Sequence, residues 1–190
     1  MDSDMKNQFE KSAEATGGYD EVCKTSWGGF SAVRQGDRWG LVDGSFEILP
    51  CMYEEVYPFP NGCIGVKLHG KWGLVNQACE QLVPCIYDDV DGESSGDYVR
   101  VQLDGKLGLV YKDGKMALPC EYDEVDIFYG DYAPVRRNGK WGVVDEECAE
   151  VFPCEYDYVE IQDFSKEGYA RIKLDGRTCY IYDKGEMAWD

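Results

Sequence analysis

Residues 139–156 read GKWGVVDEECAEVFPCEY, and residues 70–87 repeat the pattern as GKWGLVNQACEQLVPCIY. The Pro-Cys-x-Tyr ending occurs four times, with its cysteine at positions 51, 85, 120 and 154. A near-constant period of about 34 residues is typical of repeat proteins, in which each unit buries its apolar face against its neighbours. The sequence therefore predicts tandem repeats.

Within each period, a short turn-forming pair lies between two apolar runs. In the repeat quoted first, this pair is Asn138-Gly139. Its equivalents are His69-Gly70, Asp104-Gly105, Asp175-Gly176 and, in reversed order, Gly36-Asp37. These residues tolerate the positive φ of primed two-residue turns, so each period is expected to hold a β-hairpin. The single histidine, His69, is thus predicted to be a turn residue, and a catalytic role is not expected.

A two-residue turn fixes which hairpin residues face each other. It places Arg136 opposite Trp141, and this pair is expected to form a cross-strand cation–π contact. The same count gives Arg34 opposite Trp39, Lys67 opposite Trp72, Gln102 opposite Leu107 and Lys173 opposite Thr178. The cation is thus absent where leucine replaces the indole, while the last copy breaks the rule. Val135 is predicted opposite Gly142, where the missing side chain lets a neighbouring layer approach.

After each hairpin, an apolar run leads into Pro-Cys-x-Tyr and predicts a third short strand, with the proline at a strand start, an edge or a bulge. We expect an all-β fold of tandem ~34-residue β-hairpin repeats in an open twisted array or solenoid. The alternative is a closed five-bladed propeller-like ring, in which residues 19–22 and the C-terminal residues 189–190 complete one blade together. Residues 1–18 carry no repeat and are expected to form a mobile tail or a short capping helix, and residues 19–190 the repeat domain of about five units.

Composition excludes several classes of function. The 190 residues hold 19 Lys and Arg against 37 Asp and Glu, a net charge of −18, which argues against direct binding of nucleic acid or an anionic membrane. A basic protein surface is the expected partner. The nine cysteines are odd in number and no signal peptide precedes them, so reduced thiols in the cytoplasm are expected. No stretch has the length of a membrane span.

Two residue sets could suggest chemistry, and neither does so convincingly. The acidic pairs 54–55, 88–89 and 123–124 have neighbouring side chains that point to opposite faces of a strand, so solvated acids are favoured over a metal site. The cysteine column at 51, 85, 120 and 154 would be spaced one repeat apart, which suits small buried side chains better than a zinc site. No nucleophile–base arrangement or phosphate-binding loop is present. We expect no enzyme activity, no metal and no cofactor.

The motif Gly70-Lys71-Trp72-Gly73, its copy at 139–142 and the following Pro-x-x-Tyr resemble the WG-repeat (KWG repeat) family. The resemblance covers residues 19–190 and implies a β-rich interaction scaffold, of bacterial or phage source, without shared catalytic residues. The chain departs from the family pattern at Leu107 and at Thr178-Cys179, and it has cysteine where the family often has a second proline. The departure at 178–179 suggests a terminal cap.

The expected function is a non-enzymatic protein-binding scaffold with an acidic, Tyr-rich surface for a basic protein. Its candidate contact residues are Tyr53, Glu54, Glu55, Tyr87, Asp88, Asp89, Tyr122, Asp123, Glu124, Tyr156 and Asp157. Packing between repeats is an equally good explanation for the tyrosines. The alternative function is an inhibitor that mimics nucleic acid and blocks a DNA- or RNA-binding protein; a small-molecule ligand, or a hydrolase or transferase activity, is not favoured.

Overall fold

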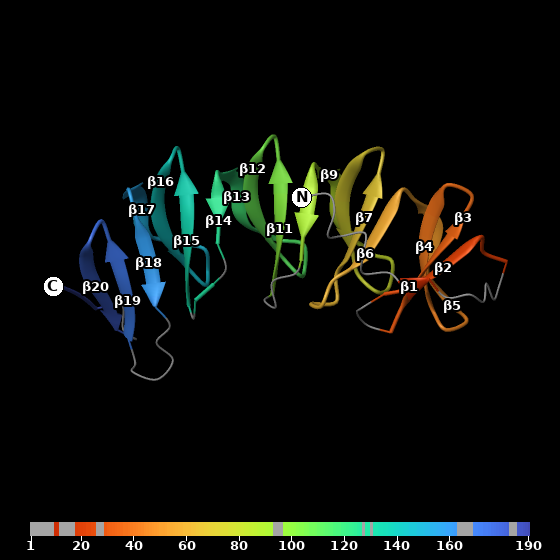
Figure 1. Ribbon diagram of the computed structural model, residues 1–190, viewed down its shortest axis with the longest axis horizontal. Helices are drawn as coiled ribbons and strands as arrows, with labels where there is room; N and C mark the ends of the chain where they lie inside the picture. Colours follow the sequence, from red (N-terminus) through yellow and green to blue (C-terminus); the bar gives the residue numbers. More distant parts are fainter. Residues whose placement is uncertain are drawn as a thin grey trace. The chain divides into compact units, whose positions relative to one another are not determined.

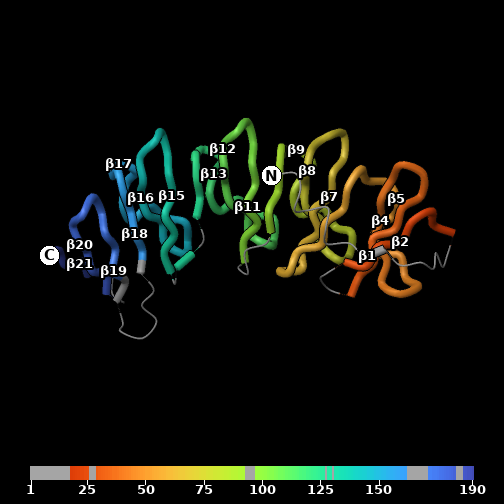
Figure 2. Tube along the Cα trace, viewed as in Figure 1, coloured from red at the N-terminus to blue at the C-terminus, as the bar shows by residue number. Residues whose placement is uncertain are grey.

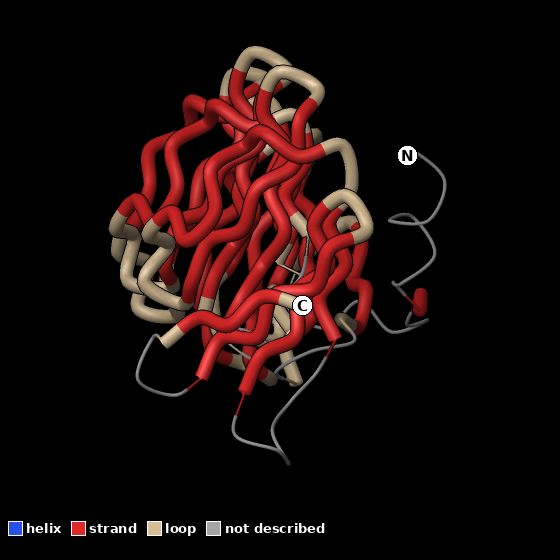
Figure 3. The backbone as a smooth tube through the Cα atoms, turned by 90° about the vertical axis from the view of Figure 1, so that its left-hand side faces the viewer, coloured by secondary structure: helices blue, strands red, loops and turns tan. Residues whose placement is uncertain are grey.

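The computed structural model describes residues 10–11, 18–25, 29–92, 97–126, 128–129, 131–162, 169–182 and 186–190. Strands, turns and bends make up their regular structure, and Figure 3 shows no helix among them. None of these residues belongs to a helix that could cross a membrane. The predicted all-β class is confirmed. Most of the predicted N-terminal tail, 1–18, lies outside the described residues, although Glu10 and Lys11 form a short strand.

The strands form five antiparallel sheets, and none of the described sheets closes on itself (Figure 1). The first holds β1 (Glu10–Lys11), β2 (Glu21–Lys24), β3 (Ser31–Gln35), β4 (Arg38–Asp43) and β5 (Phe46–Tyr53). The second holds β6 (Glu55–Pro58), β7 (Ile64–Leu68), β8 (Lys71–Val75) and β9 (Gln81–Tyr87). The third holds β10 (Asp89–Asp91), β11 (Tyr98–Leu103), β12 (Lys106–Tyr111) and β13 (Met116–Tyr122).

The fourth sheet holds β14 (Glu124–Val125), β15 (Tyr132–Arg137), β16 (Lys140–Asp145) and β17 (Glu150–Tyr156). The fifth holds β18 (Val159–Gln162), β19 (Tyr169–Leu174), β20 (Arg177–Tyr182) and β21 (Met187–Trp189). In every sheet the strands pair in sequence order. The repeat architecture predicted from the period is therefore confirmed.

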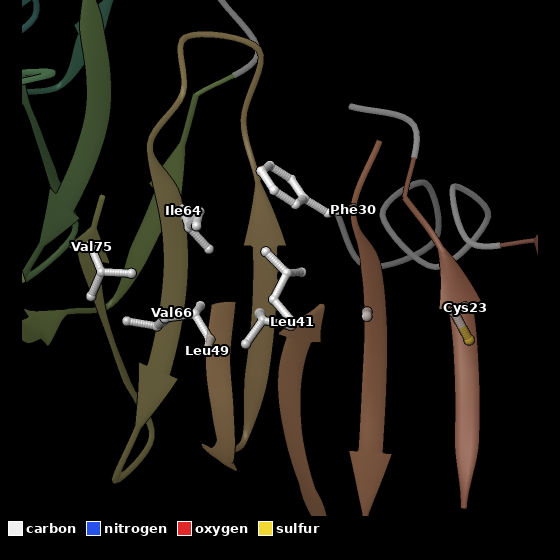
Figure 4. Close-up of a cluster of buried hydrophobic side chains, with 9 residues drawn as sticks. Cys23, Phe30, Leu41, Leu49, Ile64, Val66 and Val75 are labelled. Atoms are coloured by element: carbon white, nitrogen blue, oxygen red, sulfur yellow. The ribbon is translucent and has the colours of Figure 1, made fainter. Parts of the chain in front are cut away.

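The chain divides into two compact units, residues 1–103 with 110–116 and residues 104–109 with 117–190. The first unit has a core in which Leu41 and Leu49 of the first sheet gather with Ile64 and Val66 of the second (Figure 4). The second unit has its own core, where Val143 and other side chains of the fourth sheet pack against the fifth. The first sheet thus buries an apolar face against the second, and the fourth buries one against the fifth.

The hairpin turns have the predicted backbone. His69, Asp104, Asn138 and Asp175 have φ between 50° and 54°, and the glycine after each is also positive. Two consecutive positive φ angles are the mark of a type I′ turn, whose twist matches the flanking strands. In the first sheet Gly36 has φ 61° and Asp37 is not positive, which is the type II′ arrangement that requires glycine first.

The predicted hairpin register is confirmed in the four sheets whose pairing can be compared. Arg136 faces Trp141 and Val135 faces Gly142. The pairs Arg34 with Trp39, Lys67 with Trp72 and Lys173 with Thr178 are also as predicted. The turn chemistry alone was sufficient here, because a two-residue loop leaves no freedom in the strand alignment.

The glycine after each indole has a different neighbour from the one predicted. A Cβ added at Gly73 would lie 2.7 Å from the Val83 carbonyl oxygen and 2.8 Å from the Cys85 amide nitrogen. These atoms belong to β9 of the same sheet, so the expectation that a neighbouring layer approaches the glycine is wrong. The pairing of β8 with β9 jumps from Trp72–Tyr87 to Leu74–Val83, and this β-bulge at Pro-Cys-x brings the backbone over the glycine.

Each sheet also contains a strand that the sequence interpretation did not assign. The residues after Tyr53 form β6, which pairs with the following hairpin strand β7; the passage from β5 into β6 can be followed in Figure 2. Each sheet is thus a hairpin flanked on both sides. The idea that the two ends of the chain share one blade is wrong, because Val22 pairs with Val33 in the first sheet and Trp189 with Cys179 in the fifth.

Candidate functional site

Three of the sheets each contain a row of four side chains that crosses the strands near the hairpin turn. In the fourth sheet the row is formed by Glu124, Arg136, Trp141 and Tyr156, each directly opposite the next. Glu21, Arg34, Trp39 and Tyr53 form the row of the first sheet, and Glu55, Lys67, Trp72 and Tyr87 that of the second. An acid, a cation, an indole and a phenol thus lie side by side, and the register of the four strands produces this order.

The cation in each row contacts both of its neighbours. Arg34, Lys67 and Arg136 lie over the indoles of Trp39, Trp72 and Trp141 at 5.8, 5.4 and 5.8 Å from the ring centroids. The predicted cation–π contacts are confirmed. The same cations form ion pairs with Glu21, Glu55 and Glu124. In the last sheet Lys173 keeps the ion pair, with Glu160, although Thr178 replaces the indole.

The tyrosines of the predicted contact set are not equally accessible. Tyr87 and Tyr122 are buried, at 4% and 5% exposure, whereas Tyr53 and Tyr156 are half-buried. Burial raises the pKa of Tyr53 and Tyr122, and Arg137 lies over the Tyr122 ring at 5.6 Å. Tyr53 packs against the core of the first unit and Tyr156 against that of the second. All four therefore contribute to packing, and two retain exposed surface.

In three of the sheets the first acid of the pair binds the turn of the hairpin that follows. Glu54 accepts hydrogen bonds from the backbone N–H groups of His69 and Gly70, at 3.0 and 2.8 Å. Asp123 accepts one from Gly139 at 3.0 Å, and Asp20 one from Gly36 at 2.6 Å. Since such donors stabilise an ionised carboxylate more than a protonated one, the Gly70 N–H lowers the pKa of Glu54.

The same first acid also pairs with a cation of the preceding hairpin. Lys71 binds Asp88, Lys106 binds Asp123 and Lys140 binds Asp157, while Arg38 lies 3.5 Å from Glu54. Lys106 is the main cause of the lowered pKa of Asp123. Glu54 and Asp123 thus each connect two successive hairpins. In the fifth sheet the direction is reversed, because the Asp175 carboxylate accepts the N–H groups of Asp157 and Tyr158.

The two acids of a pair therefore have separate partners, as strand alternation predicts. Sequence reasoning assigned no turn-binding role to the first acid, although a signal was available. The acid precedes the turn glycine by 16 positions at Asp20 and Gly36, at Glu54 and Gly70, and at Asp123 and Gly139. This spacing is more constant than that of the loops that vary between repeats.

The cysteine column lies on the bulge, above the glycines. The thiols of Cys51, Cys85 and Cys154 lie 3.6, 3.7 and 3.8 Å from the carbonyl oxygens of Val33, Val66 and Val135. The glycine has no side chain, so the thiol can reach across to the strand beyond it. Burial raises the pKa of all three cysteines, which keeps them protonated and able to donate. All nine cysteines are free.

The rest of the described chain offers little for catalysis or ligand binding. Among the described residues, no group of three or more His, Cys, Asp and Glu side chains is arranged to hold a metal ion. One small cavity of about 80 Å³ is lined by Phe30, Pro58, Phe59, Pro60, Gly62, Cys63, Ile64 and Gln77. Pockets for organic ligands usually have several hundred Å³, so this cavity is too small for such a ligand.

The sequence matches the model of a family described as WG containing repeat, over residues 39–72, 72–106, 108–141 and 141–177. No curated protein matches the chain. Solved structures with a distant likeness include BBS1N in complex with ARL6DN, with 14% identity, a TM-score of 0.33 and coverage of 85% of this chain. The chain spans 64% of that protein's length.

Two further structures have a likeness of the same order. Prolyl oligopeptidase B from Galerina marginata has 10% identity, a TM-score of 0.34 and coverage of 89% of this chain and 32% of its own. PorZ of the type-IX secretion system of Porphyromonas gingivalis has 12% identity, a TM-score of 0.28 and coverage of 90% and 25%. Scores of this size carry no functional argument.

Proposed function

Because the chain belongs to the family of proteins with WG containing repeats, we propose that it is a non-enzymatic, cytoplasmic scaffold that presents an acidic, tyrosine-rich surface to a basic protein. The single observation that carries this proposal is that the protein's own acids already bind most of its cationic side chains. Most of the described lysine and arginine side chains are held in ion pairs with the protein's own acids. Within the described part of the chain, several of the acids in excess make no ion pair.

Several exposed carboxylates make no ion pair within the described part of the chain. They are Asp37, Asp43, Glu47, Asp131, Glu147 and Glu155. With a net charge of −18, such a surface attracts basic proteins and accelerates their association at low salt. Half-buried Tyr53 and Tyr156, together with Met52 and Ile86 at 45% and 46% exposure, supply apolar contact area.

The acids that are already paired can still contribute to the surface. The side chains of Glu55, Glu124 and Asp157 are 55%, 51% and 78% exposed within their ion pairs. Exposed ion pairs contribute about 0–1 kcal/mol, so a partner's cation can exchange with the internal one at little cost. This supports the candidate contact residues Glu55, Glu124 and Asp157, whereas Glu54 and Asp123 also hold turns and are less available.

Capture from a lysate of the source organism at low and high salt tests the proposal. The immobilised protein is expected to retain one or a few basic proteins at low salt and to release them at high salt. A variant with Glu47, Glu147 and Glu155 changed to glutamine should retain less, because these exposed acids make no described ion pair. Retention of nothing basic, or retention that does not respond to salt, would show the proposal to be wrong.

The same captured protein separates the proposal from the alternative function. If the partner binds DNA or RNA and this chain competes for the same groove, the inhibitor that mimics nucleic acid is supported. If the partner binds nucleic acid and this chain simultaneously, or binds no nucleic acid, the scaffold is supported. The net charge of −18 by itself does not distinguish the scaffold from the inhibitor.

A further inference from the structure

The row of the third sheet lacks a cation that the other four rows possess. In the first, second and fourth sheets the second acid of the pair holds the cation opposite it: Glu21 with Arg34 at 2.9 Å, Glu55 with Lys67 at 2.7 Å and Glu124 with Arg136 at 2.5 Å. In the fifth sheet Glu160 lies opposite Lys173 and holds it at 3.1 Å. In the third sheet the equivalent acid is Asp89, and the residue opposite is Gln102. Four equivalent carboxylates therefore show which ligand this position binds.

The surroundings of Asp89 leave its charge poorly compensated. The carboxylate is half-buried and accepts the backbone N–H of Val90 at 3.0 Å, and among the described residues it forms no ion pair. The nearby cations are engaged elsewhere, Lys67 with Glu55 and Arg100 with Asp91. Burial raises the pKa of Asp89, and the neighbouring charge of Asp91 raises it further. An added cation would offset both effects, because an opposite charge nearby favours the ionised carboxylate.

We propose that Asp89, with Gln102 beside it, receives a lysine or arginine side chain of the basic protein partner. This inference rests on the proposed function and assigns one binding position on the acidic surface. The incoming cation takes the place that Arg34, Lys67, Arg136 and Lys173 occupy in their own rows. A guanidinium can bind the carboxylate with two parallel hydrogen bonds, and the Gln102 amide oxygen is a further acceptor.

Two features favour this position over the other row acids and over a metal ion. At Glu21, Glu55 and Glu124 an incoming cation must first displace an internal one, whereas Asp89 has none to displace. A calcium ion requires six to eight oxygen ligands, and a single half-buried carboxylate cannot supply them. A side-chain cation needs only the carboxylate.

The test uses a defined cationic probe, an acetylated and amidated octa-arginine peptide, and the full chain. Binding is measured by titration at low salt, and the Asp89 carboxyl carbon is followed by NMR. Asp89→Asn is expected to raise the Kd about fivefold, the loss of one charge-assisted hydrogen-bonded pair. The matched control is Glu21→Gln, which removes the same charge from an acid that Arg34 already occupies, and which should raise the Kd less than about twofold.

A second pair of variants tests the position by filling it. Gln102→Arg restores the cation opposite Asp89 and is expected to weaken peptide binding about as much as Asp89→Asn. Its control, Gln81→Arg, adds the same charge at an exposed position of β9 and should have a smaller effect. Circular dichroism establishes that each variant is folded.

The outcomes separate this inference from the proposed function. If Asp89→Asn and Glu21→Gln weaken binding equally, or if the Asp89 carboxyl signal does not move, the inference is overturned and the acidic surface stands. If the unmodified protein does not bind the peptide at low salt, the proposed function fails together with the inference. A selective effect of both Asp89→Asn and Gln102→Arg supports the inference.

Discussion

Replacing Gly73 by alanine tests the relation between the glycine and the bulge most directly. The added Cβ would lie 2.7 Å from the Val83 carbonyl oxygen, 2.8 Å from the Cys85 amide nitrogen and 2.8 Å from the Pro84 carbonyl carbon. All three are backbone atoms, so the contact is relieved only by shifting β9. Overpacking of this kind costs about 1–3 kcal/mol, and a displaced Cys85 thiol also loses the Val66 carbonyl.

One effect opposes this cost. Gly73 does not have a positive φ, so alanine suits its backbone and would restrict the unfolded chain, a gain of about 0.4–1 kcal/mol. The net expectation is a loss of about 1 kcal/mol, because the steric cost exceeds the entropic gain. Urea denaturation would show it as a lower midpoint with an unchanged slope.

The control is Gly70→Asn in the adjacent turn. Gly70 has φ 75° and no atom within 4 Å of an added Cβ, and asparagine tolerates the left-handed region, so this variant should remain within about 1 kcal/mol of the unmodified protein. Hydrogen exchange should report faster opening of β8 and β9 in Gly73→Ala only. Equal or greater stability of Gly73→Ala would refute the steric argument.

Three further predictions concern the rows, the turns and the thiols. A double-mutant cycle of Lys67→Met and Trp72→Leu is expected to give a coupling of about 0.5–1 kcal/mol by urea denaturation, and a coupling of zero would remove the cation–π contact as a source of stability. The pKa of Glu54 is lowered in the folded state, so its contribution is present above the unfolded pKa of about 4.3 and is lost as pH falls below it; the urea midpoint should fall less between pH 6 and 3 in Glu54→Gln, and an identical fall would contradict this. Exposed Cys79 should react with a thiol reagent before Cys85, which is half-buried, and mass spectrometry of partly labelled protein that finds the reverse order would contradict the assigned burial.

The hairpins were predictable from the sequence because their information is local. A two-residue turn with residues such as Asn138 and Gly139 sets the register, and the register sets the pairing of Arg136 with Trp141. No knowledge of other sheets is needed for this. The repeat period then extends the conclusion from one hairpin to the whole array.

Features that depend on contacts between successive hairpins were not predictable in the same way. The Glu54 carboxylate binds a turn that begins fifteen residues later, and a single copy of the motif does not indicate that contact. The close approach over Gly73 was expected, but its source was wrong, because a bulge is not encoded by alternation and only the proline hints at it. The additional strand β6 is short and carries a charged residue, so it has little strand signal of its own.

The position of Glu54 between two successive hairpins also defines where one repeat can be exchanged for another. A deletion of residues 54–87 removes one period and joins Tyr53 to Asp88, an acid that replaces Glu54 at the junction. Arg38 before the cut and the turn after it would then find a carboxylate between them as before. Recombination at this boundary keeps an acid between one hairpin and the next, so it marks a position in the gene at which a repeat can be deleted, inserted or replaced.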